Sequence, residues 1–588
     1  MILQALFDYY EELGAQGKIA RPGWAKVKVS WALEIDENGK LLDVLPLRRP
    51  SENGKKMLPR EMELPAPIKR TVGILPNFLW DTSTYILGLD NKGKEKRAGE
   101  CFEAAKAHHQ TLLRAADSPA AKAVIAFFEN WNPRIADAIP AFAAHKDDLL
   151  AGDNLCFFYD GSFAAEDAAV RSAWQNAYEN AADGVTTYCL ITGRETVPEL
   201  IHPAIKNVRD AQSSGAALVS FNAPAFCSYG KEQNANAPVS KYAAFAYTSA
   251  LNHLLADREH VKIIGNTTVV YWASNAEEQY QDAFAALFDG ADDEQVSNTD
   301  LDALMTSIAA GKPYDYDGLP LVPDNDFYIL GISPNAARLS VRFFYRRSFG
   351  EIVRNLKRHY EDIQIVTDNR SKWSTIPLWA LLRETVNQKS SDKSPLPQLA
   401  GDVMKSMLSG GRYPETLMNQ TMLRIKAERE VNRGKAGIIK AYLIRNTENL
   451  PERESIMEVA QVSLNTESSY TPYVLGRLFS VLEGIQKTAN PKIDTTIKDR
   501  YFSAACATPA ATFPILLRLS NSHLKKIKNT DAGKAVYWSK QIGEMLEHLG
   551  MDFPVHQSLQ EQGAFILGYY HQTQKHFEKK TNNNKEEE

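Results

Sequence analysis

The chain has 588 residues, enough for about two to four domains, and its 44% apolar and 24% charged residues are ordinary for a globular protein. No stretch approaches the roughly 18 consecutive apolar residues that a membrane span needs, so no membrane partner is expected. The five cysteines are far apart, form no metal-ligand spacing and are odd in number, which favours a reducing cytoplasm.

The first part of the chain, residues 1–390, is predicted to be mixed α/β. An amphipathic helix is predicted at 1–18, and alternating apolar residues then predict a hairpin that turns at Asn38-Gly39. Helices are predicted at 98–116, 119–130, 350–363 and 376–388, and strands at 154–161, 185–193, 215–221 and 261–273. Residues 326–349 predict a second hairpin, with its turn at Ser333-Pro334-Asn335.

The remainder of the chain is predicted to be an all-α helical bundle, over residues 399–588. A polar, proline-bearing stretch at 391–398 predicts the linker before it. The apolar residues at 474, 475, 478, 482 and 485 share one helical face, and similar patterns recur between 400 and 577. The low-complexity tail at 579–588 is predicted to be disordered.

The net charge of −5 hides basic blocks in the second half of the chain, at 338–373, 412–445 and 518–540. Such blocks are the electrostatic footprint expected of a protein that contacts a polyanion. The alternative is that they are solvated helix faces, and the sequence leaves both readings open.

Compact catalytic motifs are missing from the sequence: there is no P-loop, HExxH, GxSxG or GxGxxG. His108-His109 has no carboxylate four residues on, and the pair Asp315 and Asp317 suits a turn as well as a cation. We therefore predict no metal and no cofactor. An enzyme is not excluded, because active sites also assemble from residues that are distant in sequence.

A long polar loop, Ser220–Ser240, is the most distinctive segment. It has three Asn, one Gln and three Ser, with Phe221, Phe226 and Tyr229 among them. Amides present a donor beside an acceptor, as base edges require, and aromatic rings stack on bases. The alternative is an ordered loop whose amides satisfy backbone groups and whose phenylalanines enter the core.

A family resemblance favours the first reading. "SFNAPAFCSYGKEQNANAPVSKYAAFAYTSALNHLL" resembles the signature stretch of the large subunit of the type I-C CRISPR surveillance complex, Cascade. Further matching stretches lie at 69–90, 328–352, 409–428, 473–486 and 500–524, so the resemblance spans nearly the whole chain. One departure is Thr82, where the family is expected to carry an amide.

The resemblance implies a non-catalytic, cytoplasmic protein of antiviral defence. Such a subunit recognises the protospacer-adjacent motif (PAM) on duplex DNA, nucleates strand opening for crRNA pairing, stabilises the R-loop and docks the helicase-nuclease. Its partners would be crRNA, target double-stranded DNA, the backbone, crRNA-processing and small subunits of Cascade, and that helicase-nuclease. The competing prediction is a metal-dependent nucleic-acid-processing enzyme whose active site is scattered through the first half.

The resemblance also assigns candidate residues. The PAM-reading candidates are Asn222, Tyr229, Lys231, Gln233, Asn234, Asn236 and, more weakly, Asn77. The candidates for contact with the nucleic-acid backbone are Arg338, Arg342, Arg346, Arg347, Arg354, Arg358, Arg518, Lys525, Lys526 and Lys528. Strand alternation places Arg342 and Arg346 on one face and Arg347 on the other. Arg354 and Arg358 would share one face of the next helix.

The resemblance further implies that the C-terminal helical part is made a second time, as a separate small subunit that begins at an internal start. Met457 opens a helical piece, 457–588, that is long enough to fold alone. Met422 and Met418 are weaker candidates for the start.

Overall fold

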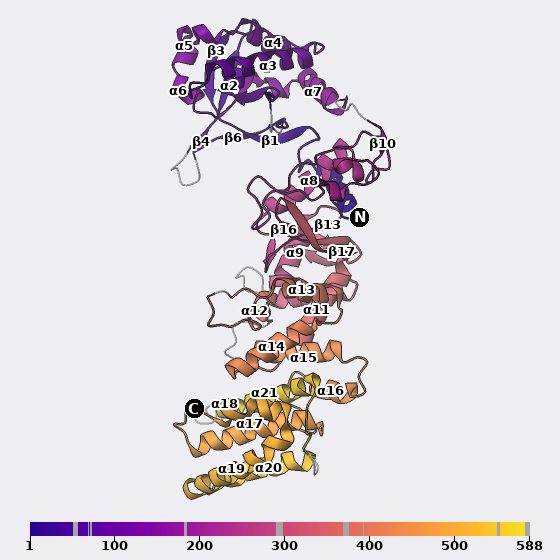
Figure 1. Ribbon diagram of the computed structural model, residues 1–588, viewed down its shortest axis with the longest axis vertical. Helices are drawn as coiled ribbons and strands as arrows, with labels where there is room; N and C mark the ends of the chain where they lie inside the picture. The colour runs from indigo at the N-terminus through magenta and orange to yellow at the C-terminus, as the bar shows by residue number, and fades with distance from the viewer. Residues whose placement is uncertain are drawn as a thin grey trace. The chain divides into compact units, whose positions relative to one another are not determined.

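The structure is a computed structural model that describes residues 1–50, 57–68, 70, 73–180, 185–289, 298–367, 375–391, 393–549 and 553–582. It has 51% helix and 16% strand, with the strands in the first part and helices dominating the rest (Figure 1). The predicted fold class is therefore confirmed. The chain divides into two compact units, residues 1–204 with 219–253 and residues 205–218 with 254–588. Among the described residues, no helix is long and apolar enough to cross a membrane.

The first unit carries its strands early and most of its helices between them. Its elements are α1 (Ile2–Ala15), β1 (Trp24–Val29), β2 (Trp31–Ile35), β3 (Leu41–Pro46), β4 (Arg49–Pro50), β5 (Met57–Leu58), β6 (Arg60–Pro65), β7 (Trp80–Thr82), α2 (Ser83–Ile86), α3 (Glu95–Leu113), α4 (Pro119–Asn130), η1 (Pro133–Ala138), α5 (Pro140–Ala143), α6 (Lys146–Leu149), β8 (Asn154–Tyr159), β9 (Ser162–Phe163), η2 (Ala164–Glu166), α7 (Ala168–Asn180), β10 (Thr187–Tyr188), β11 (Glu195–Thr196), η3 (Pro224–Phe226), η4 (Gln233–Asn236) and α8 (Lys241–Ala256).

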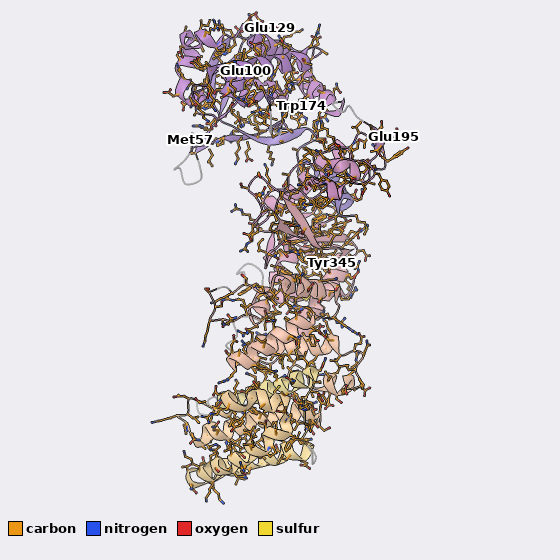
Figure 2. The ribbon with its side chains drawn as sticks, viewed as in Figure 1. Met57, Glu100, Glu129, Trp174, Glu195 and Tyr345 are labelled. Atoms are coloured by element: carbon orange, nitrogen blue, oxygen red, sulfur yellow. The ribbon has the colours of Figure 1, made fainter. Side chains whose placement is uncertain are left out.

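A five-stranded sheet forms the core of this unit, in the order β3-β2-β8-β7, with β9 paired to β8. The predicted turn at Asn38-Gly39 is confirmed between β2 and β3, and Gly39 has φ +71°. A Cβ at Gly39 would lie 2.0 Å from the backbone nitrogen of Phe127 in α4, so only glycine allows the turn to press against that helix. Figure 2 shows the side chains of this unit, with Met57 on the short strand β5 and Trp174 on α7.

Two predicted strands of the first half are not formed as expected. Within 185–193 only Thr187 and Tyr188 are extended, because the chain turns back at Gly193, whose φ is +67°. Within 215–221 there are only isolated bridges, from Ala216 to Ile205 and from Ala217 to Arg338. An apolar run forms a full strand only where a neighbouring strand pairs with it along its length. Neither segment has such a neighbour among the described residues.

The second unit begins with a sheet and continues into helices. Its elements are β12 (Lys262–Ile264), β13 (Thr267–Ala273), α9 (Glu278–Asp289), α10 (Asn298–Ala309), β14 (Tyr314–Tyr316), β15 (Leu319–Leu321), β16 (Asp326–Asn335), β17 (Arg338–Ser348), α11 (Phe349–Ile363), α12 (Leu378–Arg383), α13 (Pro397–Ser409), α14 (Glu415–Glu428), α15 (Arg433–Asn446), α16 (Arg453–Val459), α17 (Thr471–Ala489), α18 (Ile497–Ala507), α19 (Pro509–Thr530), α20 (Ala532–Leu549) and α21 (Leu559–Asn582).

Antiparallel strands β12-β13-β16-β17 make the sheet of this unit. The predicted hairpin is present, but it turns at Ala336-Ala337, after Asn335 pairs with Arg338. Ala336 takes the left-handed conformation (φ +52°), and Ser333 and Pro334 remain within β16. The carboxylates at 315 and 317 frame a second tight hairpin, β14–β15, which confirms the turn reading of that stretch.

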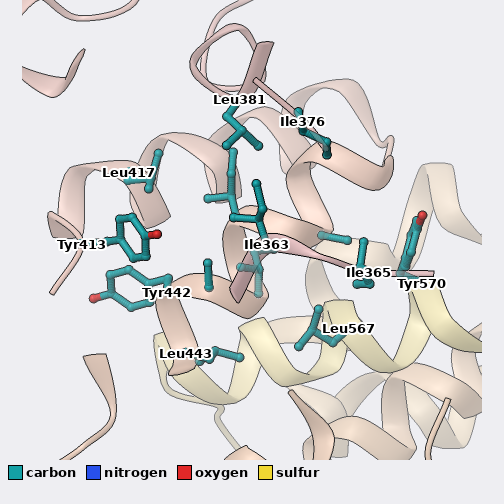
Figure 3. Packing of buried hydrophobic residues seen from close by; sticks show 14 of the residues in the cluster. Ile363, Ile365, Ile376, Leu381, Tyr413, Leu417, Tyr442, Leu443, Leu567 and Tyr570 are labelled. Atoms are coloured by element: carbon teal, nitrogen blue, oxygen red, sulfur yellow. The ribbon is translucent and has the colours of Figure 1, made fainter. Parts of the chain in front are cut away.

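One continuous apolar core runs through the second unit, from the sheet to the last helices. Figure 3 shows part of it, with Leu381 of α12, Leu417 of α14, Tyr442 of α15, and Leu567 and Tyr570 of α21 among the residues of this core. Of the predicted linker at 391–398, residues 397–398 open α13, and the described residues before them lie inside this unit and not between the two units.

Helix α17 is the centre of the C-terminal bundle, and α18, α19, α20 and α21 contact it. The predicted apolar face of α17 is buried, and so is most of the rest of the helix. α17 and α21 cross at glycines: a Cβ at Gly476 would lie 1.9 Å from the carbonyl oxygen of Phe565, and one at Gly568 would lie 2.1 Å from that of Tyr473. Helix α21 continues to Asn582, so 579–582 are helical, while 583–588 lie outside the described residues.

Candidate nucleic-acid interface

The polar loop Ser220–Ser240 is anchored at its C-terminal end. Ser240 caps α8 by accepting from the Ala243 backbone N–H (3.1 Å), and its own N–H donates to Cys189 Sγ (3.3 Å). Burial alone would raise the pKa of the Cys189 thiol, but hydrogen bonds from Thr192 and Ser240 lower it to about 7. Backbone bonds from Leu190 to Pro238 and from Glu199 to Val239 complete the anchor.

Asn236 holds the shape of the loop. Its Oδ1 accepts from the Ser228 N–H (2.9 Å), and its Nδ2 donates to the carbonyls of Lys231 (3.1 Å) and Gln233 (2.9 Å). These three bonds occupy most of what an amide can offer. The amide of Asn236 therefore satisfies backbone groups of the loop, which is the alternative to base reading. To read a base, Asn236 would have to break these bonds.

The tip of the loop projects side chains into solvent. Tyr229 is 99% exposed and has φ +55°, Gly230 has φ +69°, and Gln233 has φ +44°. Left-handed conformations at non-glycine residues cost free energy and persist where surrounding contacts hold them, which Asn236 does here. Asn222, Lys231 and Gln233 are also exposed, and Phe226 is 41% exposed, so the aromatic side chains of the loop are not part of the core.

The other two amide candidates are buried. Asn234 lies in the loop, and no hydrogen-bond partner is found for its Oδ1 among the described residues. Asn77 precedes β7, where its Oδ1 accepts from the Ile68 N–H (3.0 Å) and its N–H donates to Asp81 (2.9 Å). Asn77 thus supports the local backbone, and of the amides predicted from sequence only Asn222 and Gln233 are exposed.

Strand β17 carries arginines with intramolecular partners. Arg346 donates to Asp326 (2.7 Å) and lies over the ring of Tyr328, whereas Arg347 pairs with Glu351 (3.0 Å). These residues pair with neighbours on opposite faces, as predicted. Both ion pairs are largely exposed, so each contributes little to stability and can exchange for a phosphate.

The prediction that Arg342 shares a face with Arg346 is wrong. A β-bulge places Val341 and Phe343 opposite Ile332 and Gly331, which leaves Arg342 as the extra residue. Arg342 then donates to Ser333 Oγ (2.6 Å). Ser333 lies five residues after Tyr328 on β16, so their side chains point to opposite faces of the sheet. The bulge therefore directs Arg342 away from the face of Arg346.

Helix α11 presents Arg354 and Arg358 on its exposed side. Arg354 Nε donates to the carbonyl of Ala309 (3.3 Å), and Arg358 Nη1 donates weakly to that of Gly410 (3.4 Å). Each guanidinium keeps further donors for a ligand. Arg338 is half-buried at the start of β17.

A family comparison now adds to this geometry. The family model described as CRISPR-associated protein (Cas_Csd1) matches residues 6–577, nearly the whole chain. The chain belongs to this family. The resemblance read from the sequence is thereby confirmed, and the chain is a CRISPR-associated protein whose family fits the large subunit of type I-C Cascade. No curated protein matches it.

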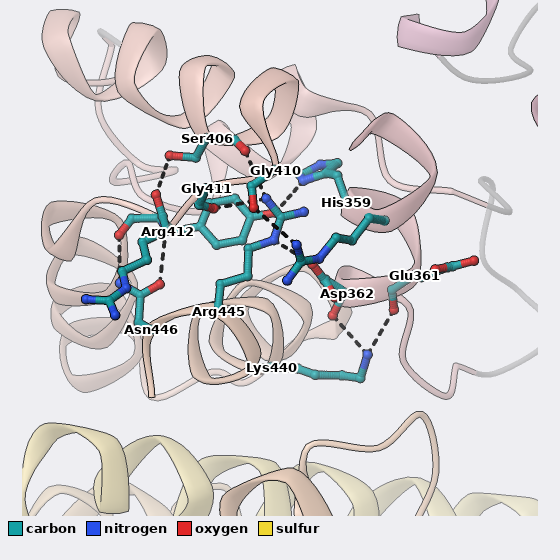
Figure 4. A network of polar contacts seen from close by, with 12 residues as sticks. His359, Glu361, Asp362, Ser406, Gly410, Gly411, Arg412, Lys440, Arg445 and Asn446 are labelled. Atoms are coloured by element: carbon teal, nitrogen blue, oxygen red, sulfur yellow. Dashed lines mark hydrogen bonds and ion pairs between the residues drawn. The ribbon is translucent and has the colours of Figure 1, made fainter. Parts of the chain in front are cut away.

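In this Cas_Csd1 chain, part of the basic block at 412–445 is interior. Lys435, Lys440 and Arg445 are at most 3% exposed. Figure 4 shows Arg445 donating to Asp362 (2.6 Å) and to the carbonyls of Ser406 (2.9 Å) and Gly411 (3.1 Å). Neither predicted alternative, polyanion footprint or solvated face, applies to these three side chains.

The basic residues of α19 lie on the surface of the Cas_Csd1 chain. Arg518, Lys525, Lys526 and Lys528 are exposed, and Lys526 donates to Asn490 (2.6 Å). Arg518 and Lys525 are seven residues apart, two helical turns, and so share a face. Met457 is half-buried within α16, so a piece that begins there starts inside a helix.

The histidine pair of this Cas_Csd1 chain supports the fold. His109 is fully buried, its Nδ1 donates to the Ala105 carbonyl (2.7 Å), and its Nε2 accepts from the Leu79 N–H (2.8 Å). Burial lowers the pKa of His109 to about 3, so the ring is neutral. Within the described ranges, no group of three or more His, Cys, Asp or Glu residues is arranged to hold a metal ion.

Proposed function

We propose that this chain is the non-catalytic large subunit of a type I-C Cascade and that it recognises the PAM on duplex DNA, opens the duplex for crRNA pairing, stabilises the R-loop and docks the helicase-nuclease. The observation that carries the proposal is the loop Ser220–Ser240, with its anchored base and its exposed tip of Tyr229, Lys231 and Gln233. A preorganised tip loses little conformational entropy on binding. An amide, a cation and an aromatic ring together suit a base edge, a phosphate and a base step.

The test uses single alanine variants at Asn222, Tyr229, Lys231 and Gln233 in the assembled complex. Binding to duplexes with and without the PAM is compared, and Asn91→Ala, an exposed amide elsewhere in the same unit, serves as the control. Loss of one good base contact should weaken PAM-dependent binding by about 1–3 kcal/mol, roughly 5- to 150-fold. If all four variants keep full discrimination, the loop does not read the PAM.

The proposal that the C-terminal part is also made as a separate small subunit is tested by substituting Met457. Helices α17 to α21 pack on one another around α17, which supports a piece that folds alone. Met457→Leu conserves volume and helix propensity while removing the start codon. Mass spectrometry of the expressed operon should find a C-terminal product that begins at Met457 in the parent and not in the variant. A product that persists in the variant, or that is absent from the parent, contradicts this start.

The absence of catalysis is itself a proposal. Purified chain is incubated with labelled DNA and RNA in Mg²⁺ or Mn²⁺, the ions that a carboxylate-rich nuclease site would use. We expect no cleavage. Metal-dependent cleavage that co-purifies with the chain would favour the competing enzyme prediction.

A further inference from the structure

A cleft in the second unit lies outside the candidate residues singled out from the sequence. It is lined by Arg209, by β12 with the following Gly265, by Phe288 at the end of α9, by α12, and by residues 393–395. Figure 1 labels α9 and α12, which contribute residues to this lining. The volume of about 310 Å³ is at the lower end of the range for ligand pockets.

The charged side chains that line the cleft, within the part of the chain that the structure describes, are all basic. Arg209, Lys262, Arg383 and Lys393 line it, and none of the lining residues, all of them within the described ranges, is an Asp or Glu. Arg209 Nε lies 3.7 Å from Asp210 Oδ2 in an exposed ion pair. Such a pair is weak, so the cleft presents a positive potential to an anion.

An aromatic side chain stands beside these cations. Trp379 is 48% exposed, although its neighbours Leu378, Leu381 and Leu382 are buried in the core and fix α12. Phe288 and Pro395 extend the apolar wall. A large ring held on a rigid helix among arginines and lysines is what proteins use to stack a base and bind its phosphates.

We propose that this cleft binds a nucleotide of a single-stranded nucleic acid, with its base on Trp379 and its phosphates on Arg209, Lys262, Arg383 and Lys393. The guanidinium fork of Arg383 matches the geometry of a phosphate, and the lysines add point charge. The inference rests on the proposed function only in that the chain acts on nucleic acid; no residue of the PAM loop takes part. The shared chemistry is a phosphodiester-linked nucleotide, which DNA or RNA can supply.

The test measures binding of the full chain to labelled oligothymidylate and oligouridylate of ~15 nucleotides by fluorescence anisotropy. Trp379→Ala should weaken binding about 5- to 100-fold, while Trp379→Phe, which keeps a ring, should retain most of it. Arg383→Glu should weaken binding and reduce the salt slope by about 0.7 per lost phosphate contact. The matched control is Lys312→Glu, an exposed lysine of the same unit, which should bind as the parent does.

Photocrosslinking locates the contact. A strand that carries 5-iodouracil should crosslink to Trp379 in the parent chain, and whichever of the two polymers crosslinks identifies the source. If Trp379→Ala and Arg383→Glu bind as tightly as Lys312→Glu, or the crosslink maps elsewhere, the proposal is overturned. PAM discrimination by the assembled complex should survive Trp379→Phe and Arg383→Glu, so failure of the loop and failure of the cleft give different results.

Discussion

Two basic segments of the second unit resemble one another in composition and differ in what their charges do. In α15, Lys435, Lys440 and Arg445 are buried and hold neighbouring segments together, whereas on α19 Arg518 and Lys525 point into solvent. The difference lies in the residues between the charges. α15 is buried around nearly its whole circumference, so its cations need internal partners, whereas α19 keeps an exposed polar face. A count of charges therefore predicts a nucleic-acid surface only when the helix has a side that solvent can reach.

The sharpest test of this contrast is Arg445→Met. It leaves the Asp362 carboxylate and the carbonyls of Ser406 and Gly411 without their donor, and breaking a buried pair in this way costs about 3–5 kcal/mol. We expect a large loss in the free energy of unfolding by urea, measured on the purified chain.

The matched control is Arg518→Met on α19, which should change the free energy of unfolding by no more than about 0.5 kcal/mol. The double variant Arg445→Met/Asp362→Leu should recover part of the loss, because the buried Asp362 carboxylate that Arg445→Met leaves unpaired is removed as well. Equal stability of Arg445→Met and Arg518→Met would remove the distinction between the two segments.

His260 extends the comparison to an interior cation held by two carboxylates. Its Nδ1 lies 2.5 Å from Asp257 Oδ2 and its Nε2 2.6 Å from Asp282 Oδ1. Burial lowers the pKa of His260, but the two carboxylates outweigh it and raise the pKa to about 9.

Because the folded chain binds this proton more tightly than the unfolded chain, the stabilisation is complete below about pH 6.5 and is lost as the pH rises to about 9. His260→Gln should remove this decline, which is roughly 1.4 kcal/mol per unit of pKa difference. Urea titrations across pH 6–9.5 measure it, and a parent chain of constant stability over that window would contradict the assignment.

Lys440 should behave in the opposite way. It donates to the carbonyls of Glu361 (3.0 Å) and Asp362 (2.9 Å), and burial lowers its pKa to about 8. Above that pH the unfolded chain binds this proton more tightly, so the contribution of Lys440 makes the free energy of unfolding rise between about pH 8 and 10.5. Comparing the parent with Lys440→Met isolates that slope, and identical profiles would show that Lys440 does not titrate in this window.

The smallest effect on stability is expected from the exposed helix. The variant Arg518→Glu/Lys525→Glu should unfold like the parent within about 0.5 kcal/mol. Its binding to all nucleic-acid sequences should weaken alike, with a salt slope lower by about 0.7–0.9 for each lost phosphate contact. A loss confined to particular sequences would instead indicate base reading by α19.

Local signals in the sequence predicted the helices well. The turn at Gly39 and the helices from α13 to α21 follow from glycine, proline and apolar spacing, which act within one or two turns of chain. What the sequence hides is set by the folded geometry: the bulge that redirects Arg342, the bonds that occupy Asn236 within its own loop, and the burial of Arg445 against Asp362. The cleft around Trp379 is the extreme case, since its cations come from four separated segments and none lies in a recognisable motif.

The glycine crossing of α17 and α21 also constrains how the bundle is assembled. With Gly476 against Phe565 and Gly568 against Tyr473, the two backbones touch, and three other helices separate them along the chain. A ribosome makes α17 before α21, so the part of α17 that α21 covers stays exposed until the later helix emerges. Synthesis of this region thus passes through a stage at which nascent α17 is a substrate for chaperones or for association with other chains.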